Sequence, residues 1–163
     1  MAARKAGVKL LMAGKIDPLK QGYFNKKVKP YLNQKIKFLG ELPFSQLVKL
    51  YQGALGFLYP IEWNEPFGLV MAEAMACGTP VIAFDNGSVK EIVKHNKTGF
   101  VVPFKNKKKK TNIAGLVEAI KNTSRISRHD CRAWIEQEFT LQKMVDNYEA
   151  LYYKLLCAKN SRS

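Results

Sequence analysis

Two glutamates, Glu65 and Glu73, stand on either side of Gly68 with seven residues between them. The apolar residues before this segment predict a strand, and the residues from Gly68 onward predict a helix. The first amide groups of a helix and the positive end of its dipole favour a phosphate, and glycine lets a ligand approach the backbone closely. Carboxylates would repel that phosphate, so they are useful there only as acceptors for hydroxyl groups, which sugars supply. The pattern indicates a ligand that combines phosphate and sugar, such as a nucleotide sugar.

An alternative interpretation is that both glutamates are ordinary surface acids on an amphipathic helix. The sequence around Glu73 argues against it, because the residues at 72 and 74–76 are small or apolar. A carboxylate in such surroundings needs a hydrogen-bonding partner or a ligand cleft.

Other site chemistry finds little support in the sequence. The chain has no G-x-G-x-x-G after its first predicted strand, no phosphate-binding P-loop and no Asp-x-Asp metal motif. Its only histidines, His95 and His129, are far apart in the sequence, and His95 is interpreted as a solvated turn residue. Cys77, between Ala76 and Gly78, is interpreted as a small packing residue rather than a nucleophile. The segment from Asp85 to Gly87 is first a turn and only second a candidate site.

The elements that would position these residues alternate along the chain. Apolar runs predict strands, and helical spacing or capping residues predict helices between them. Short strands without polar alternation, linked through helices, indicate a parallel sheet covered on both faces. We therefore expect an α/β fold with a Rossmann-like parallel sheet. The predicted strands are 8–13, 36–39, 54–59, 81–84 and 99–102. The predicted helices include 23–32, one capped by Ser45, 68–77, one opened by a Ser88–Glu91 capping box, 112–121, 128–139 and an amphipathic helix from Leu141 to Leu155.

Composition sets outer limits on the function. The chain has 163 residues, 27 Lys and Arg against 13 Asp and Glu, and a formal net charge of +14. Its longest nearly apolar run, 54–61, is far shorter than the ~20 residues that a membrane-spanning helix needs. No secretory signal pattern is visible, and the three cysteines form no C-x-x-C pair, so we expect a cytoplasmic protein. The charge, densest at Lys105–Lys110, is compatible with peripheral contact with an anionic membrane, but no nucleic-acid motif accompanies it.

The segment from Glu65 to Val102 resembles retaining, nucleotide-sugar-dependent glycosyltransferases of family 4, which have the GT-B fold. The resemblance rests on the string EPFGLVMAEAMACGTPVIA from Glu65, on GSVKEI from Gly87 and on TGFVV from Thr98. It extends to FLGEL at 38–42 and to the C-terminal helix. Glu65 and Glu73 correspond to the E-x7-E motif of that family.

The resemblance implies one donor-binding domain over residues 1–163, with a C-terminal helix at 140–158. It implies that Glu73 holds the ribose hydroxyls and that Glu65, the catalytic candidate, contacts the donor sugar. It also implies that backbone groups near the phosphates and the base complete the donor site, at Phe67, Gly68, Leu69, Val70, Gly40 and Leu42. The resemblance implies no metal and no cofactor besides the nucleotide-sugar donor, transfer with retention, and a glycan or lipid-linked acceptor.

Two departures from the family leave alternatives open. Family members are longer, with an N-terminal acceptor domain, and their donor domain opens with a strand and a Gly-Arg-Leu…Lys-Gly loop whose cations clamp the diphosphate. Neither matches here, so the donor-binding domain is expected to be partial at its N-terminus and to lack its first strand. Lys15 and Lys20 are not assigned to the clamp. The chain could therefore be the donor-binding part of an enzyme, completed by a second chain or inactive alone, or a non-catalytic nucleotide-sugar-binding module. A binder of nucleic acid or anionic surfaces is a third reading, which the two acids disfavour.

Overall fold

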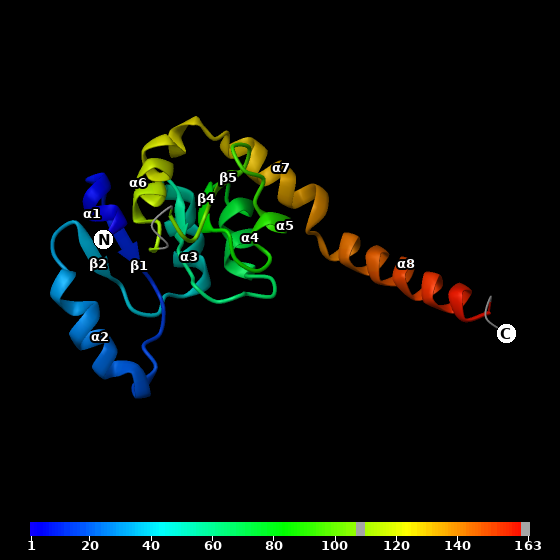
Figure 1. Ribbon diagram of the computed structural model, residues 1–163, viewed down its shortest axis with the longest axis horizontal. Coiled ribbons are helices and arrows are strands. Elements are labelled where there is room, and N and C mark those ends of the chain that lie inside the picture. Colours follow the sequence, from blue (N-terminus) through cyan, green and yellow to red (C-terminus); the bar gives the residue numbers. More distant parts are fainter. Residues whose placement is uncertain (107–109, 161–163) are drawn as a thin grey trace.

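The computed structural model describes residues 1–106 and 110–160 and has an α/β architecture built on parallel strands (Figure 1). Strands β1 (Leu10–Met12) and β2 (Ile36–Phe38) form a two-stranded parallel sheet. Strands β3 (Phe57–Tyr59), β4 (Val81–Phe84) and β5 (Gly99–Val102) form a second parallel sheet in that order. The expected fold class is confirmed, but the single sheet is divided between β1 and β3.

Helices cover both faces of the three-stranded sheet, as the alternation along β4 shows. Val81 and Ala83 belong to one buried cluster, together with residues of α4 and α7. Ile82 and Phe84 belong to another, with residues of α1 and α6. Because successive side chains of a strand point to opposite faces, the two clusters are the two sides of the sheet. The fully buried strand β4 therefore needs the continuous apolar run that the sequence shows.

The helices agree with the expected order, with one addition. Helix α1 was not predicted, and it packs against α6 through the buried Ala2 and Ala3. Residues 23–32 divide into α2 and a short 3-10 turn at Lys29–Tyr31. The helices are α1 (Ala2–Ala6), α2 (Gln21–Lys27), α3 (Phe44–Gly53), α4 (Leu69–Ala76), α5 (Val89–Ile92), α6 (Ile113–Asn122), α7 (Arg128–Glu138) and α8 (Leu141–Asn160).

Two predicted helix caps are wrong. Helix α3 begins at Phe44 with Pro43 at its N-cap, so Ser45 lies inside the first turn. Ser88 does precede α5, but its side chain makes no capping hydrogen bond. Its hydroxyl instead donates to the carbonyl oxygen of Phe67 at 2.6 Å. A tertiary acceptor therefore takes the group that the local sequence pattern assigns to the helix.

Helix α8 extends away from the two sheets in Figure 1. It occupies 141–160, close to the expected 140–158. The apolar stripe predicted for it is solvent-exposed, at Leu141, Met144, Tyr148, Leu151, Tyr152 and Leu155. Within the described residues, none of the helices combines the length and apolar character that crossing a bilayer requires.

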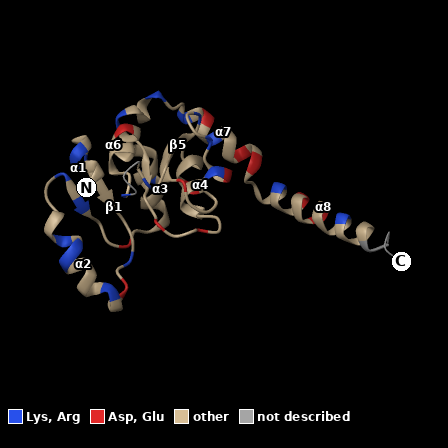
Figure 2. Ribbon diagram, viewed as in Figure 1, with Lys and Arg blue, Asp and Glu red and all other residues tan. Residues whose placement is uncertain are grey.

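Basic residues are spread over elements that lie far apart, including α1, α2, α7 and α8 (Figure 2). Of the run Lys105–Lys110, residues 107–109 lie outside the described part of the chain, while Lys105 and Thr111 form an antiparallel bridge.

Candidate functional site

Gly68 joins the loop after β3 to helix α4. It is buried and has φ 83° and ψ 65°, a left-handed conformation that L side chains rarely adopt. A Cβ added there would lie 2.8 Å from Met71 Cε, 3.3 Å from the Tyr59 hydroxyl and 3.4 Å from Glu65 Cγ. Gly68 is therefore the point where the end of β3, the Glu65 side chain and the first turn of α4 meet.

Glu65 is half-buried and has two aromatic neighbours, Trp63 and Tyr59. The indole Nε1–H of Trp63 donates to Glu65 Oε2 at 3.0 Å. Burial, and secondly the charge of Glu65, raise the pKa of the Tyr59 phenol. The carboxylate is thus held at the edge of the loop with acceptor capacity left for a ligand hydroxyl, since its two oxygens offer about four lone-pair sites.

The loop after β4 holds the Glu65 loop in place. Ser88 donates its backbone N–H to the Glu65 carbonyl oxygen at 3.1 Å, and Asn86 Nδ2 donates to the Ile61 carbonyl oxygen at 3.1 Å. A Cβ on Gly87 would overlap the Glu65 backbone, so only glycine fits this approach. From the sequence, Asp85 to Gly87 were predicted first as a turn and Ser88 as a helix cap, not as supports of the Glu65 loop. The signal that could have found them is position, because both loops follow the carboxyl ends of neighbouring parallel strands.

Glu73 lies on α4 and faces α3. It is half-buried, and the pKa of the buried Tyr51 phenol rises to about 12 through burial first, then through the charge of Glu73 and a hydrogen bond with it. The carboxylate therefore has the partner that its apolar neighbours in sequence require. One phenol does not use all of its acceptor sites, so a ligand hydroxyl can still be bound.

The remaining predicted site residues lie on two sides of the division between the sheets. Phe67 packs its ring against Phe139 at 5.8 Å between centroids, and Leu69 is exposed at the start of α4. Val70 lines an apolar groove of about 960 Å³ between β1 and β3. Gly40 and Leu42 follow β2, and the Gly40 carbonyl oxygen accepts from the Gly14 N–H at 2.8 Å. Helix α3, which follows Leu42, carries Tyr51 to Glu73 and so connects this loop to the Glu65–Glu73 segment.

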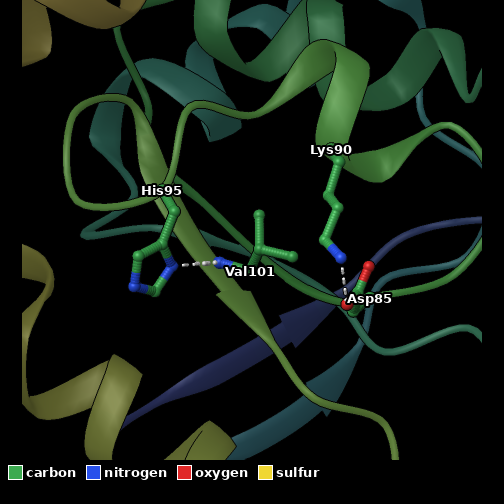
Figure 3. A network of polar contacts seen from close by, with 4 residues as sticks. All are labelled: Asp85, Lys90, His95 and Val101. Carbon is green, nitrogen blue, oxygen red and sulfur yellow. Dashed lines mark hydrogen bonds and ion pairs between the residues drawn. The ribbon is translucent and has the colours of Figure 1, made fainter.

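The residues interpreted as non-catalytic have structural contacts. Figure 3 shows Val101 of β5 donating its N–H to His95 Nδ1, at 3.1 Å, and Lys90 paired with Asp85 at 2.7 Å. Burial is the main cause that raises the pKa of the Cys77 thiol, which disfavours the reactive thiolate. In the part of the chain that the structure describes, no three His, Cys, Asp or Glu side chains are grouped so as to hold a metal ion.

Replacing Tyr51 with phenylalanine should reduce the loss of stability at high pH. An unfolded tyrosine titrates near pH 10 and folded Tyr51 near pH 12, so between these values the unfolded chain loses its proton first. The contribution of neutral Tyr51 is complete below pH 10 and is lost as the pH rises to 12. Over this range the free energy of unfolding should fall in the starting chain by up to about 2–3 kcal/mol more than in Tyr51→Phe. Urea unfolding at pH 9.5 and 11.5 measures this difference. If the free energy of unfolding falls equally in both proteins between these pH values, the raised pKa of Tyr51 is contradicted.

The comparisons with known proteins agree with the fold. The family model described as glycosyl transferases group 1 matches residues 2–138. The putative glycosyltransferase YtcC of Bacillus subtilis (strain 168) is 29% identical over 136 residues, which are 82% of this chain and 33% of that protein. Sucrose-phosphate synthase from Thermosynechococcus elongatus aligns with a TM-score of 0.73 and 28% identity, over 96% of this chain and 41% of its own.

A third likeness shows the fold alone. The structure of Anabaena Alr3699/HepE in complex with UDP-glucose aligns with a TM-score of 0.73 at 21% identity, over 91% of this chain and 44% of its own. The chain thus spans about a third of YtcC and less than half of these solved chains. Because the family match extends over most of its residues, the chain belongs to the group 1 glycosyl transferases.

Proposed function

We propose that this chain binds the nucleoside diphosphate sugar donor for a retaining, metal-independent glycosyl transfer. The observation that carries the proposal is the placement of Glu65, Gly68 and Glu73. The two half-buried carboxylates stand before and within α4, and a left-handed glycine opens the helix between them. This arrangement combines a phosphate-binding helix start with acceptors for sugar hydroxyls.

In this proposal each part of the segment has one role. Glu73 accepts hydrogen bonds from the ribose hydroxyls, and Glu65 accepts them from the donor sugar. The backbone N–H groups at the start of α4, from Leu69 and Val70, bind phosphate oxygens. The Gly40–Leu42 loop lies against the base. Group 1 membership and the relative solved with UDP-glucose support this assignment and make UDP the first nucleotide to test.

The protein atoms then act by position and charge rather than by forming a covalent bond. Amides aimed at the leaving diphosphate stabilise the negative charge that develops on it. Glu65 steadies the sugar as the bond from its anomeric carbon to the diphosphate breaks and that carbon gains oxocarbenium character. The acceptor hydroxyl approaches from the same face, forms the new bond to that carbon and gives its proton to the leaving diphosphate. It stays a prediction that the acceptor is a glycan or a lipid-linked sugar. Contact of the chain with an anionic membrane also stays a prediction.

Calorimetric titration of the chain with UDP, UDP-glucose, GDP and ADP tests donor binding. We expect nucleotides with one of the three bases to bind with a Kd between about 1 μM and 1 mM. This range corresponds to about 8 to 4 kcal/mol of binding free energy. The affinity should be the same with Mg²⁺ and with excess EDTA. Absence of heat with every nucleotide would count against a formed donor site in this chain.

A DNA titration at two salt concentrations is the control for nonspecific binding by the +14 chain. Counterion release makes such binding fall steeply with salt, whereas a site built on hydroxyl contacts should depend on salt less. Tight, salt-sensitive DNA binding without nucleotide binding would favour a polyanion binder instead.

A further inference from the structure

Ser88, on the loop after β4, is bonded twice to the loop that leads into α4. Its backbone N–H donates to the Glu65 carbonyl oxygen at 3.1 Å, and its hydroxyl donates to the Phe67 carbonyl oxygen at 2.6 Å. Ser88 is only 4% exposed, so water does not compete for this hydroxyl. Within residues 1–106 and 110–160, no other group donates to the Phe67 carbonyl. The hydroxyl of Ser88 therefore determines where that carbonyl points.

The peptide plane between Phe67 and Gly68 is held at both ends. The Phe67 ring packs against Phe139, with 5.8 Å between centroids, and the Gly68 carbonyl oxygen accepts from the Met71 N–H at 2.9 Å. The freedom that this leaves to the plane is rotation about its long axis, which changes ψ of Phe67 and φ of Gly68 together. Glycine tolerates φ of either sign, so Gly68 itself does not fix this rotation. The hydrogen bond from Ser88 supplies the restraint.

This rotation determines which backbone groups a phosphate meets. A trans peptide directs its C=O and N–H to opposite sides, so a Phe67 carbonyl held toward Ser88 turns the Gly68 N–H away from Ser88. Gly68 then has the left-handed φ of 83°, next to Leu69 in the right-handed helix α4. Adjacent residues of opposite hand form a nest, a concave set of successive N–H groups that binds anions. Here these are the N–H groups of Gly68, Leu69 and Val70, and none of the three donates to an acceptor in the part of the chain that the structure describes.

Rotation of the peptide by half a turn would remove the nest. It would bring Gly68 to negative φ and place the Phe67 carbonyl oxygen, which carries partial negative charge, where the Gly68 N–H lies. A phosphate would lose one donor and meet one acceptor in its place. The anion-binding geometry at the start of α4 is therefore imposed by a side chain from the loop after β4.

We propose that Ser88 is a positioning residue for the diphosphate of the donor. Its hydroxyl fixes the Phe67–Gly68 peptide so that the Gly68 N–H joins those of Leu69 and Val70 on the phosphate oxygens. Ser88 does not touch the ligand and acts through the backbone alone. This inference rests on the proposed donor binding and names the group that sets the geometry of its phosphate site.

The test compares UDP with uridine, which has the same base and ribose but no phosphate. Ser88→Ala removes the hydroxyl and keeps the backbone N–H that bonds Glu65. By NMR titration, we expect its Kd for UDP to rise at least about tenfold, the effect of losing one hydrogen bond to a charged group, and its Kd for uridine to stay within about twofold. Ser88→Cys keeps a similar shape with a weak donor, so its affinity for UDP should lie between those of the starting chain and Ser88→Ala.

Thr123→Val is the matched control. The Thr123 hydroxyl is also buried and also donates to a backbone carbonyl, that of Ala119 at 2.9 Å. Valine keeps the shape of threonine and removes this hydrogen bond. The affinity of Thr123→Val for UDP should therefore stay within about twofold of the starting chain, although a buried hydrogen bond is lost in both variants.

Unchanged affinity of Ser88→Ala for UDP would overturn the proposal. Equal losses for UDP and uridine would also overturn it, because the hydroxyl would then support the whole site rather than its phosphate part.

A measurement without ligand separates this inference from the proposed function. The nuclear Overhauser effect between the Gly68 amide proton and the Phe67 α-proton depends on ψ of Phe67 and so reports the orientation of the peptide. We expect its intensity to change in Ser88→Ala and to stay the same in Thr123→Val. An unchanged intensity in Ser88→Ala would overturn the role of the hydroxyl whether or not nucleotides bind. A changed intensity in a chain that binds no nucleotide would support the restraint on the peptide and overturn its assignment to the donor diphosphate.

Discussion

Replacing Glu73 with alanine is expected to weaken UDP binding by roughly ten- to a hundredfold. In the proposed site this carboxylate accepts hydrogen bonds from two ribose hydroxyls. A hydrogen bond to a charged group contributes about 1.5–3 kcal/mol, and each 1.4 kcal/mol is a factor of ten in affinity. Glu73→Gln keeps one carbonyl acceptor without the charge. Its affinity for UDP should lie between those of the starting chain and Glu73→Ala. Isothermal titration calorimetry with UDP measures all three proteins.

Two variants separate this loss from a structural effect. Tyr51→Phe removes the phenol that bonds Glu73 but keeps the carboxylate, so its UDP affinity should stay within about threefold of the starting chain. Glu149→Ala removes the same charge from exposed α8 and should leave affinity unchanged. If Tyr51→Phe weakens UDP binding as much as Glu73→Ala does, the Glu73–Tyr51 contact shapes the site and Glu73 is not a ribose ligand.

The elements that the sequence predicts well are those whose limits are set by residues adjacent in the sequence. Strand β4 and strand β5 were predicted at their observed limits. Both are apolar runs whose starts are marked by a local residue. Pro80, which restricts the backbone, precedes β4, and Gly99, which has no side chain, opens β5. Helix α6 begins after Asn112, whose side chain accepts from the Gly115 N–H at 3.0 Å, which is a local capping bond.

Elements defined by distant contacts were predicted poorly. Helix α1 has five residues, too few to be stable alone, and it exists because Ala2 and Ala3 are buried against α6. The Ser88 hydroxyl bonds the distant Phe67 carbonyl instead of the helix start. Local patterns cannot rank such a tertiary acceptor against a local one.

The candidate site shows the same division. The spacing of Glu65 and Glu73 around Gly68 was readable, because it depends on one strand, one loop and one helix. The neighbours of these acids were not readable. Tyr51 comes from a different helix, α3, and Tyr59 and Trp63 approach Glu65 only through the fold of the loop. No sequence rule for paired acids names a tyrosine on a different helix.

Replacing Gly99 with alanine is expected to destabilise the chain by about 3 kcal/mol or more, a large effect for one added methyl group. Gly99 opens β5 opposite Val81 in the β4–β5 ladder. An added Cβ would overlap the Val81 carbonyl oxygen and lie 2.9 Å from both Val81 N and Val81 C. These are backbone atoms of the fully buried central strand, so neither strand can yield without losing ladder hydrogen bonds. Urea unfolding followed by circular dichroism measures the free energy of unfolding.

Gly22→Ala is the matched control, because the same methyl group added there meets nothing within 4 Å. Gly22 lies in the first turn of α2, where alanine favours the helix by about 0.5 kcal/mol, so this variant should be slightly more stable. The two alanine variants should therefore change stability in opposite directions although their chemistry is identical. A Gly99→Ala protein that unfolds at the same urea concentration as the starting chain would mean that β4 and β5 lie farther apart than the described register requires.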